Sequence, residues 1–321
     1  MTDLPAAARA RDESDFAGAV RAGLSKHPKE LPSRYFYDEI GSALFDAITA
    51  LPEYGLTRAD ARVLRHHARE IVACAGEPLT VAELGSGSGA KTRWVLQAVA
   101  EREPVTYYPI DVSCKALDGC VRELDEFGTI VPLHASYLDG LREVVSRRRG
   151  RQRLLVLFLG STIGNFDRPA IVPFLREVRE TLRRGDSLLL GTDLLKPIHT
   201  MVRAYADPTG VTSAFNLNLL GRINRELGGD FDLRHFAHVA RYNPRERRIE
   251  MHLKSTRRQK VTIRGSDFTC EFATGETIWT EACHKFRAEE IAEFAEAAGF
   301  ICDAQWIDEE WPFAESLLLA E

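Results

Sequence analysis

The stretch from residue 79 to residue 103, LTVAELGSGSGAKTRWVLQAVAERE, decides the fold. It begins with a short apolar run, turns at three alternating glycines (Gly85, Gly87 and Gly89), and continues with apolar residues at helical spacing. Glycines directly after a strand permit a tight turn, and they let backbone N–H groups approach a ligand at the positive end of the next helix. The stretch therefore predicts a strand, a ligand-binding turn and a helix.

The same alternation of short apolar runs and longer amphipathic stretches continues as far as Asp193. Five runs rich in Val, Leu and Ile are separated by helical stretches, which is typical of a parallel sheet buried on both faces. The expected strands are LTVAEL, VTYYPID, TIVPL, LLVLFLG and SLLLGTD. This pattern predicts an α/β fold with a doubly wound, Rossmann-like sheet.

The character of the sequence changes after Lys196. Two helical stretches are followed by FAHVARYN and RIEMHLKS, which predict a hairpin, and by TIWTEACHKF, which predicts a further strand. AEEIAEFAEAAGF predicts an amphipathic helix that ends at Gly299. We therefore expect a second, α+β domain, and the N-terminal segment before the first βαβ unit is expected to join it.

Composition limits the class of protein. The chain has 321 residues, 45% hydrophobic and 28% charged, with a net charge of −5, which is ordinary for a globular enzyme and gives no general attraction to nucleic acid. Its longest apolar run is too short to cross a bilayer, so we expect no membrane association. The six cysteines form no CxxC pair, and no signal-peptide pattern precedes them. We expect a cytoplasmic protein; a monomer is compatible with the sequence, which leaves the oligomeric state open.

Three kinds of nucleotide site can follow the glycine turn. A P-loop needs a glycine directly before its lysine, but Lys91 follows Ala90, so this alternative fails. A dinucleotide site accepts Gly85-x-Gly87-x-x-Ala90, so the glycine motif alone leaves it open. The third kind is a site for S-adenosylmethionine (SAM), and a turn that binds no ligand is the structural alternative.

Two acidic residues favour the SAM site. Glu83 stands two residues before the first glycine, where its charge would attract the ammonium group of SAM and repel a dinucleotide pyrophosphate. Asp111 ends the second strand, where an acid can hold ribose hydroxyls. We therefore expect SAM as the cofactor and predict that Glu83, Gly85, Gly87 and Asp111 bind it.

A polar loop follows the fourth expected strand in LLVLFLGSTIGNFDRP. In open α/β sheets, ligands bind beyond the carboxyl ends of the strands, so this loop should face the glycine turn. Asn165 in this loop can donate to a carboxylate through its amide nitrogen and accept from an ammonium through its oxygen. Its structural alternative is a turn residue ahead of the next helix.

The strand TIWTEACHKF places a carboxylate, a thiol and an imidazole close together in sequence. Side chains alternate along a strand, so Glu281 and Cys283 share one face with Lys285, and His284 lies on the other. That geometry opposes a compact metal site, and it opposes a Cys283 nucleophile with His284 as its base, so we expect no metal. Two interpretations of Glu281 remain, a surface ion pair with Lys285 and a clamp for a ligand.

Seven segments together resemble one family. They are, in order, RYFYDEIGSALFDAITALPEYGLTR, ELGSGSGAKT, LGSTIGNF, LLLGTDLLKP, AYADPTGVTSAFNLNLLGRINREL, RIEMHL and TEACHKF. The set resembles the histidine-specific Nα-methyltransferases of ergothioneine biosynthesis, from about Leu31 to the C-terminus. This resemblance implies a class I SAM-binding methyltransferase domain, at residues 59–196, and a substrate-binding domain, at residues 10–58 plus 197–321. It also implies SAM-dependent Nα-methylation of L-histidine, repeated to the trimethylated betaine hercynine.

The resemblance assigns roles to individual residues. It implies that SAM contacts Gly85, Lys91 and Asp111, with Ser136 and Tyr137 beside the adenine. The residues that it implies around histidine are Asn165 and Tyr205 at the carboxylate, Tyr37 near the amine, Glu281 at the imidazole, Met251 in the pocket wall, and Ala282 and Cys283 beside Glu281.

Three positions depart from the family pattern. Gly55 stands where the family often has a second tyrosine, Ser136 replaces an aspartate beside the adenine, and Cys283 replaces a serine at the second imidazole contact. A thiol is a poorer hydrogen-bond donor than a hydroxyl. Gly55 and Cys283 therefore keep open a methyltransferase for another amino acid or amine. Ser136 keeps open a protein that binds the cofactor without turnover, and a dehydrogenase is a further alternative.

The expected chemistry is direct transfer of the sulfonium methyl group to the α-nitrogen of histidine. The donor is already activated by its positive sulfur, so neither a metal nor a covalent enzyme intermediate is needed. Positioning then supplies much of the rate acceleration, up to roughly 7–11 kcal/mol for a well-aligned pair. The sequence indicates no strong base near the amine, so the route by which its proton leaves is unassigned.

Overall fold

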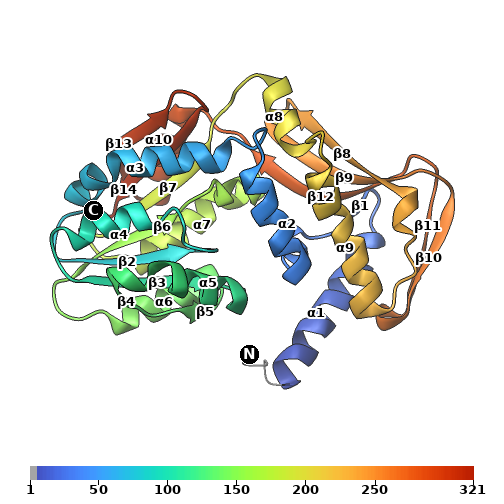
Figure 1. The fold of residues 1–321 in the computed structure, drawn as a ribbon, viewed down its shortest axis with the longest axis horizontal. Helices are drawn as coiled ribbons and strands as arrows, with labels where there is room; N and C mark the ends of the chain where they lie inside the picture. Colours follow the sequence, from blue (N-terminus) through green and yellow to red (C-terminus); the bar gives the residue numbers. More distant parts are fainter. Residues whose placement is uncertain (1–5) are drawn as a thin grey trace. The chain divides into compact units, whose positions relative to one another are not determined.

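The computed structural model describes residues 6–321, with side chains from residue 15 onward. The chain divides into two compact units (Figure 1). Unit 1 comprises residues 1–54 and 197–283, and unit 2 comprises residues 55–196 and 284–321. The expectation about a signal peptide concerns the start of the chain, of which residues 1–5 lie outside the described part. Within residues 6–321, every helix is too short or too polar to cross a lipid bilayer.

Unit 2 is built on an eight-stranded sheet with the order β13-β14-β7-β6-β2-β3-β4, in which β5 also pairs with β3. The central strands are parallel: β2 (Leu79–Leu84), β3 (Val105–Asp111), β6 (Arg153–Phe158) and β7 (Ser187–Asp193). These strands confirm four of the five predicted runs. The fifth run, TIVPL, forms two short strands, β4 (Gly128–Ile130) and β5 (Leu133–His134), because Pro132 has no N–H to continue the ladder.

Helices cover both faces of the unit 2 sheet. One buried apolar cluster joins the sheet to α3 (Leu56–Ala75), α4 (Arg93–Ala100) and α5 (Cys114–Leu124). A second cluster joins the opposite face to α6 (Tyr137–Arg147), α7 (Arg168–Thr181) and α10 (Ala288–Ala298). Both faces of the central strands are therefore buried, which explains their continuous apolar sequences. The predicted doubly wound α/β fold is confirmed.

The C-terminal segment differs from the prediction, which placed residues 284–321 in the substrate-binding domain. Instead, β14 (Phe313–Leu319) pairs antiparallel with β7, and β13 (Ile301–Asp308) pairs antiparallel with β14. Strand β14 is buried along almost its whole length, so it needs covered faces on both sides. The doubly wound sheet provides both faces, and helix α10 packs against α7 of the same unit.

Unit 1 contains a four-stranded sheet with the order β1-β12-β9-β8. Strands β8 (Phe236–Asn243) and β9 (Arg248–Ser255) form the predicted antiparallel hairpin, and β12 (Thr277–His284) is the predicted third strand. The short β1 (Lys29–Glu30) pairs in parallel with β12. The other elements of the unit are α1 (Ala6–Leu24), α2 (Glu39–Ala50), α8 (Ile198–Tyr205), α9 (Val211–Leu227) and the hairpin of β10 (Gln259–Ile263) and β11 (Phe268–Phe272).

Candidate functional site

The glycine turn lies in unit 2, between β2 and α4. Gly85, Gly87 and Gly89 have φ angles of 74°, 53° and 70°, a region that side chains with a Cβ rarely adopt. The Gly85 amide donates to the Ile110 carbonyl at 2.8 Å, which ties the turn to the end of β3. A Cβ added at Gly87 would meet nothing within 4 Å, so space is open beside this amide. This geometry would allow a ligand to approach the backbone of the turn closely.

Asp111, at the end of β3, lies directly beside the glycine turn. Its Oδ2 accepts from the Gly87 amide at 3.1 Å, and its Oδ1 accepts from the Ser113 amide at 2.9 Å. Burial raises the pKa of this carboxyl, although the two amides oppose that effect. The carboxylate is held at the carboxyl ends of two neighbouring strands, which is where an acid can bind the hydroxyls of a ribose.

Tyr137 begins helix α6 and approaches the same turn. A Cβ on Gly85 would lie 3.2 Å from the Tyr137 ring, and the ring packs edge-on against Phe158 at 5.4 Å between centroids. The preceding residue, Ser136, caps α6: its hydroxyl accepts from the Asp139 amide at 3.4 Å and donates to the Asp139 carboxylate at 2.6 Å. The structure therefore brings Gly85, Asp111 and Tyr137 together, and it uses the Ser136 hydroxyl in a helix cap.

Lys91 follows the turn and connects it to the loop after β6. Its ammonium pairs with Asp60 of α3, and Asp60 Oδ2 also accepts from the Gly160 amide at 3.0 Å. The predicted proximity of the two loops is confirmed, because a Cβ on Gly160 would lie 3.0 Å from Lys91 Nζ. Sequence reasoning missed Asp60. The available signal was a carboxylate on the buried face of an amphipathic helix, one turn after Leu56 and before Leu64.

Glu83, predicted to meet the ammonium group of SAM, is an internal group of unit 2. Its side chain is 2% exposed, and its Oε2 accepts from the Thr92 hydroxyl at 2.6 Å and from the Tyr107 hydroxyl. Burial raises the pKa of the Glu83 carboxyl to about 7, although both hydroxyls favour its charged form. Contact of Glu83 with a ligand stays a prediction, and the observed bonds give it an internal role.

The loop after β6 carries Asn165 at the end of the short helix η3 (Thr162–Asn165). Asn165 is exposed, whereas Ser161 is buried in a left-handed conformation and accepts from the Asp193 amide at 2.9 Å. Helix α7 starts only at Arg168, and its N-cap is Asp167. Asn165 therefore lies in a turn ahead of the helix without capping it, and its side chain is exposed.

In unit 1, two of the residues predicted to bind histidine belong to one aromatic cluster. Tyr37 contacts Phe45 at 5.6 Å between ring centroids, Phe45 contacts Tyr54 at 6.5 Å, and Tyr54 contacts Tyr205 at 5.9 Å. Phe215 of α9 also contacts Tyr37, at 5.9 Å. Tyr37 follows the short helix η1 (Ser33–Phe36), and Tyr205 ends α8, so the rings join segments that are far apart in the sequence.

The remaining predicted residues of unit 1 lie on neighbouring strands. Met251 is buried on β9, and Glu281 is half-buried on β12 beside the buried Ala282 and Cys283. The Thr280 hydroxyl donates to the Met251 carbonyl at 3.0 Å and links the two strands.

The ion-pair alternative for Glu281 required an accessible Lys285. Instead, the Lys285 side chain is 0% exposed, and its ammonium bonds Asp193 Oδ2 at 2.7 Å. Lys285 is therefore a buried partner of Asp193, and the ligand contact of Glu281 stays a prediction.

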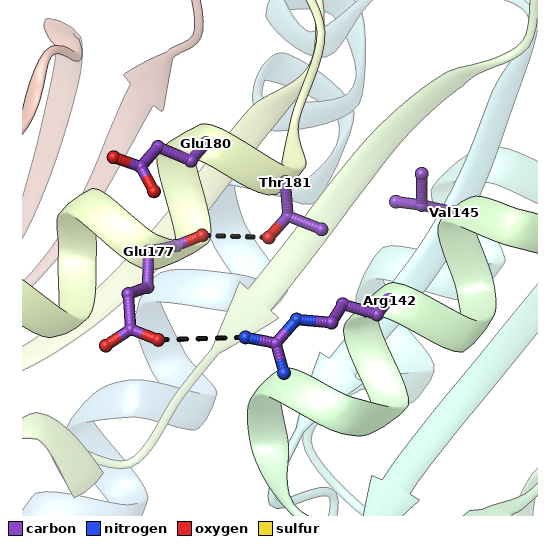
Figure 2. Close-up of a pocket in the computed structure, with 5 residues that line it drawn as sticks. All are labelled: Arg142, Val145, Glu177, Glu180 and Thr181. Atoms are coloured by element: carbon purple, nitrogen blue, oxygen red, sulfur yellow. Dashed lines mark hydrogen bonds and ion pairs between the residues drawn. The ribbon is translucent and has the colours of Figure 1, made fainter.

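A shallow pocket of unit 2 lies apart from these residues. Figure 2 shows it between α6 and α7, lined by Arg142, Val145, Glu177, Glu180 and Thr181. Arg142 pairs with Glu177 at 3.7 Å, so the charges of the pocket partly neutralise one another. It contains none of the predicted site residues. Within the described part of the chain, no group of three or more His, Cys, Asp or Glu side chains is arranged to hold a metal ion.

The doubly wound sheet, with a glycine turn after β2 and a carboxylate at the end of β3, defines the class of the protein: it is a class I SAM-dependent methyltransferase. The family follows from comparison with known proteins. Residues 16–320 match the family described as histidine-specific methyltransferase, SAM-dependent. The chain belongs to this family, which confirms the resemblance found in the sequence.

Known relatives cover almost the whole chain. A histidine N-alpha-methyltransferase of Mycobacterium tuberculosis is 44% identical over 300 residues, covering 93% of this chain and 92% of the relative. A protein of the same name from Mycolicibacterium smegmatis is 45% identical over the same shares. An L-tryptophan methyltransferase of Psilocybe serbica is 29% identical over 91% of this chain and 89% of the relative.

Proposed function

We propose that this enzyme transfers the methyl group of SAM to the α-nitrogen of L-histidine, and repeats the transfer until the trimethylated betaine, hercynine, is formed. The observation that carries the proposal is the match of residues 16–320 to a histidine-specific family. Two mycobacterial relatives named histidine N-alpha-methyltransferase, each covered over 92% of its length, support it. The product assigns the enzyme to ergothioneine biosynthesis.

The donor is assigned to the glycine turn of unit 2. The glycine turn precedes the positive end of α4, the Asp111 carboxylate accepts from the ribose hydroxyls, and Tyr137 lies beside the adenine. Lys91 provides a positive charge for the carboxylate of the methionine moiety. The open space beside Gly87 and the fixed position of Asp111 support this assignment.

The residues of unit 1 that are assigned to the acceptor are Tyr37, Tyr205, Met251 and Glu281. Tyr205 holds the carboxylate of histidine, and Tyr37 lies near its amine. For Asn165, in unit 2, the resemblance likewise implies a contact with the carboxylate of histidine. Glu281 accepts a hydrogen bond from an imidazole N–H, and a charge-assisted bond of this kind contributes about 1.5–3 kcal/mol. An amino acid without such an N–H would leave the carboxylate desolvated and without a donor, so the same bond gives selectivity.

The aromatic cluster of unit 1 suits an acceptor that becomes more positive during the reaction. Each methyl transfer forms a nitrogen–carbon bond from the amine lone pair and breaks the carbon–sulfur bond, whose electrons remain on sulfur in S-adenosylhomocysteine. The amine loses a proton before each of the three attacks, by a route that is not assigned, and the final nitrogen carries a permanent charge. Faces of Tyr and Phe rings stabilise quaternary ammonium groups by about 0.5–2 kcal/mol each.

Two observations favour tryptophan as the alternative to histidine as methyl acceptor. The relative from Psilocybe serbica is named for L-tryptophan, and Cys283 is a weaker donor than the serine of the family pattern. An indole N–H can donate to Glu281 as an imidazole N–H does, so tryptophan is the natural competitor. A methyltransferase for tryptophan is therefore the alternative that the experiment must separate from histidine.

Mass spectrometry of one competition reaction tests both candidates. Purified protein is incubated with SAM and an equimolar mixture of the twenty amino acids, and the methylated products are identified. We expect mono-, di- and trimethylated histidine, with the trimethylated form accumulating. Methylated tryptophan as the main product would establish the alternative, and cofactor binding with no methylated amino acid would contradict both.

We also propose that the enzyme acts in the cytoplasm, on a small-molecule substrate and without nucleic acid. All six cysteines lie within the described part of the chain as free thiols, which supports a reducing compartment. Fractionation of the native organism, with detection of the protein and its activity in the cytosolic fraction, tests this location.

A further inference from the structure

Unit 2 buries more negative than positive charge directly behind the glycine turn. Three carboxyl groups, of Asp60, Glu83 and Glu315, are 0%, 2% and 0% exposed. Among the described residues, the ammonium group of Lys91 interacts with all three. If every group were ionised, two negative charges would stay buried without compensation, and such charges are costly in a protein interior.

Asp60 joins two loops that come from the carboxyl ends of neighbouring strands. Its Oδ2 accepts from the Lys91 ammonium, in the loop after β2, and from the Gly160 amide, in the loop after β6, at 3.0 Å. The residue is on α3, whose apolar face is anchored in the core by Leu56, Val63 and Leu64 and their neighbours. One fixed carboxylate therefore sets the distance between the two loops.

The second oxygen of Asp60 requires a proton donor. Asp60 Oδ1 and both carboxyl oxygens of Glu315 are buried, and none of these three atoms has a hydrogen-bond partner among the described residues when both groups are ionised. Glu315, on β14, is nevertheless close enough to Asp60 for a side-chain hydrogen bond. The Oε1 atom of Glu315 also lies close to the backbone of Gly191, because a Cβ added to this glycine would be 2.8 Å from it. One proton placed between the two carboxyl groups satisfies both of them.

We propose that Asp60 is a positioning residue for the methyl donor: its ionised carboxylate holds the Lys91 ammonium and the Gly160 amide in place, and a neutral Glu315 donates a proton to its second oxygen. This inference rests on the proposed function, in which Lys91 contacts SAM. The Asp60 and Glu315 side chains touch neither substrate nor cofactor. They act through Lys91 and through the loop that begins at Gly160.

The surroundings of Glu315 agree with its neutral form. Burial is the largest cause that raises its pKa well above the usual range, and the negative charge of Asp60 adds to it. The charged groups that face Glu315 are Asp60 from α3, Glu83 from β2 and Lys91 from the loop before α4. Only Lys91 opposes the shift, and its ammonium is already paired with Asp60.

The test compares three isosteric variants by calorimetric titration with SAM alone. Asp60→Asn keeps the shape but loses the charge that holds Lys91, so the dissociation constant for SAM should rise at least about tenfold. Glu315→Gln keeps a neutral donor toward Asp60 and should stay within about twofold of the wild type. The matched control is Asp186→Asn, because Asp186 also bridges a cation and an amide, Arg148 and Leu154 at 2.7 and 2.9 Å, but precedes β7 at the other end of the sheet.

A second measurement separates positioning from general stability. The ratio of the SAM affinities of the wild type and Glu315→Gln should change as the pH is raised, because only the wild type has a proton to lose at position 315. The ammonium group of SAM titrates equally in both measurements and cancels from this ratio. Two results together support the proposal. The affinity for SAM falls in Asp60→Asn and not in Asp186→Asn, and the unfolding temperatures of these two variants are lowered to a similar extent. Equal SAM affinity in Asp60→Asn and wild type, equal losses in Asp60→Asn and Asp186→Asn, or a Glu315→Gln variant that binds SAM poorly would each overturn it.

The pH comparison keeps the proposal testable if Asp60→Asn does not fold: a pH profile that is the same in the wild type and in Glu315→Gln overturns it. Failure of the proposed function looks different. In that case the wild type would bind SAM without methylating histidine, while the ranking of the variants for SAM could still hold.

Discussion

Glu281 is half-buried on β12 between two neighbours, Thr280 and Ala282, that are buried on the opposite face of the strand. Its backbone carbonyl accepts from the Trp279 indole at 2.9 Å, which stiffens the strand at this point. In the proposed function, the Glu281 carboxylate accepts a hydrogen bond from the imidazole N–H of histidine. We therefore expect Glu281 to contribute mainly to the recognition of histidine.

Replacing Glu281 by alanine should raise KM for histidine by roughly 10- to 100-fold, because the charge-assisted bond to the imidazole is lost. KM for SAM should change by less than about twofold. Initial rates measured against each substrate in turn check this separation. The Glu281→Gln variant, which keeps an acceptor oxygen without the charge, should lie between the wild type and Glu281→Ala. Unchanged kinetics with histidine in the alanine variant would remove Glu281 from the site.

Glu83 makes the free energy of unfolding depend on pH. Its pKa in the folded protein, about 7, lies above the usual value of 4.5, so folding favours the protonated form. The stability that it contributes is therefore fully present below about pH 4.5 and is lost as the pH rises through 7. Glu83→Gln removes this dependence. The free energy of unfolding of the wild type, relative to Glu83→Gln, should fall by roughly 2–4 kcal/mol between about pH 4.5 and about pH 8.

Urea denaturation of both proteins across this pH range measures the difference. A constant difference would mean that the Glu83 carboxyl has an ordinary pKa in the folded protein. Glu315 contributes with the same sign, and the charge of Glu83 adds to its shift, so the two groups are not independent. Repeating the comparison in a Glu315→Gln background isolates the contribution of Glu83.

At the scale of elements, the start of α3 depends on the turn between β13 and β14. Gly55 caps α3 in an ordinary helical conformation, so its φ of −71° does not require glycine. Glycine is required here for lack of space, because a Cβ at position 55 would lie 2.2 Å from the nearest carbon of the Trp311 indole. Trp311 in turn donates from its ring nitrogen to Asp193 Oδ1 at 3.0 Å. In this chain the indole therefore occupies the space that a side chain at position 55 would need.

The Gly55→Ala variant should lower the free energy of unfolding by about 1–3 kcal/mol, because the added methyl group overpacks the contact with Trp311. Adding Trp311→Leu should recover part of that loss, so the two changes together should cost less than the sum of the single changes. A double-mutant cycle by chemical denaturation measures this coupling. Gly18→Ala is the matched control, since a Cβ there would meet nothing within 4 Å.

At the scale of the whole molecule, the sequence predicted best those elements whose pattern repeats locally. The apolar runs of β2, β3, β6 and β7 follow from burial on both faces, and the β8–β9 hairpin follows from its alternation and turn. The C-terminal strands were misplaced because β14 pairs with β7, and such pairing leaves no signal within either strand. The antiparallel addition to a parallel sheet depends on the fold of the whole unit.

The candidate site was predictable to a similar degree. Gly85, Gly87 and Asp111 form a spacing motif within one βαβ unit, and the structure brings them together at 3.1 Å between the Gly87 amide and Asp111 Oδ2. Asp60 and Glu315 were not predicted, because their partners lie on other elements and a single buried carboxylate belongs to no local motif. The aromatic contacts of Tyr37 and Tyr205 likewise depend on tertiary packing.

The three positions at which the chain enters or leaves unit 2 lie close to one buried carboxylate, that of Asp193. Asp193 bonds Lys196 at 2.6 Å and Lys285 at 2.7 Å, and it accepts from Trp311, whose ring packs on Gly55. Residues 55, 196 and 284 are the ends of the segments that form this unit. Unit 2 is therefore assembled from two separate pieces of chain, and its central sheet is complete only when the second piece has joined the first.

This discontinuity has a consequence for synthesis. The ribosome makes β14 after β7 and after the whole intervening segment of unit 1, so the apolar edge of β7 stays without its neighbour until β14 has been made. An uncovered edge of this kind promotes aggregation. A chain that lacks residues 312–321 should accumulate in the insoluble fraction on expression, whereas loss of the exposed Glu321 alone should have no effect. A shortened chain that stayed soluble and monodisperse by gel filtration would show that the nascent sheet tolerates an open edge. Otherwise, the newly made protein depends on residues 312–321 to avoid self-association.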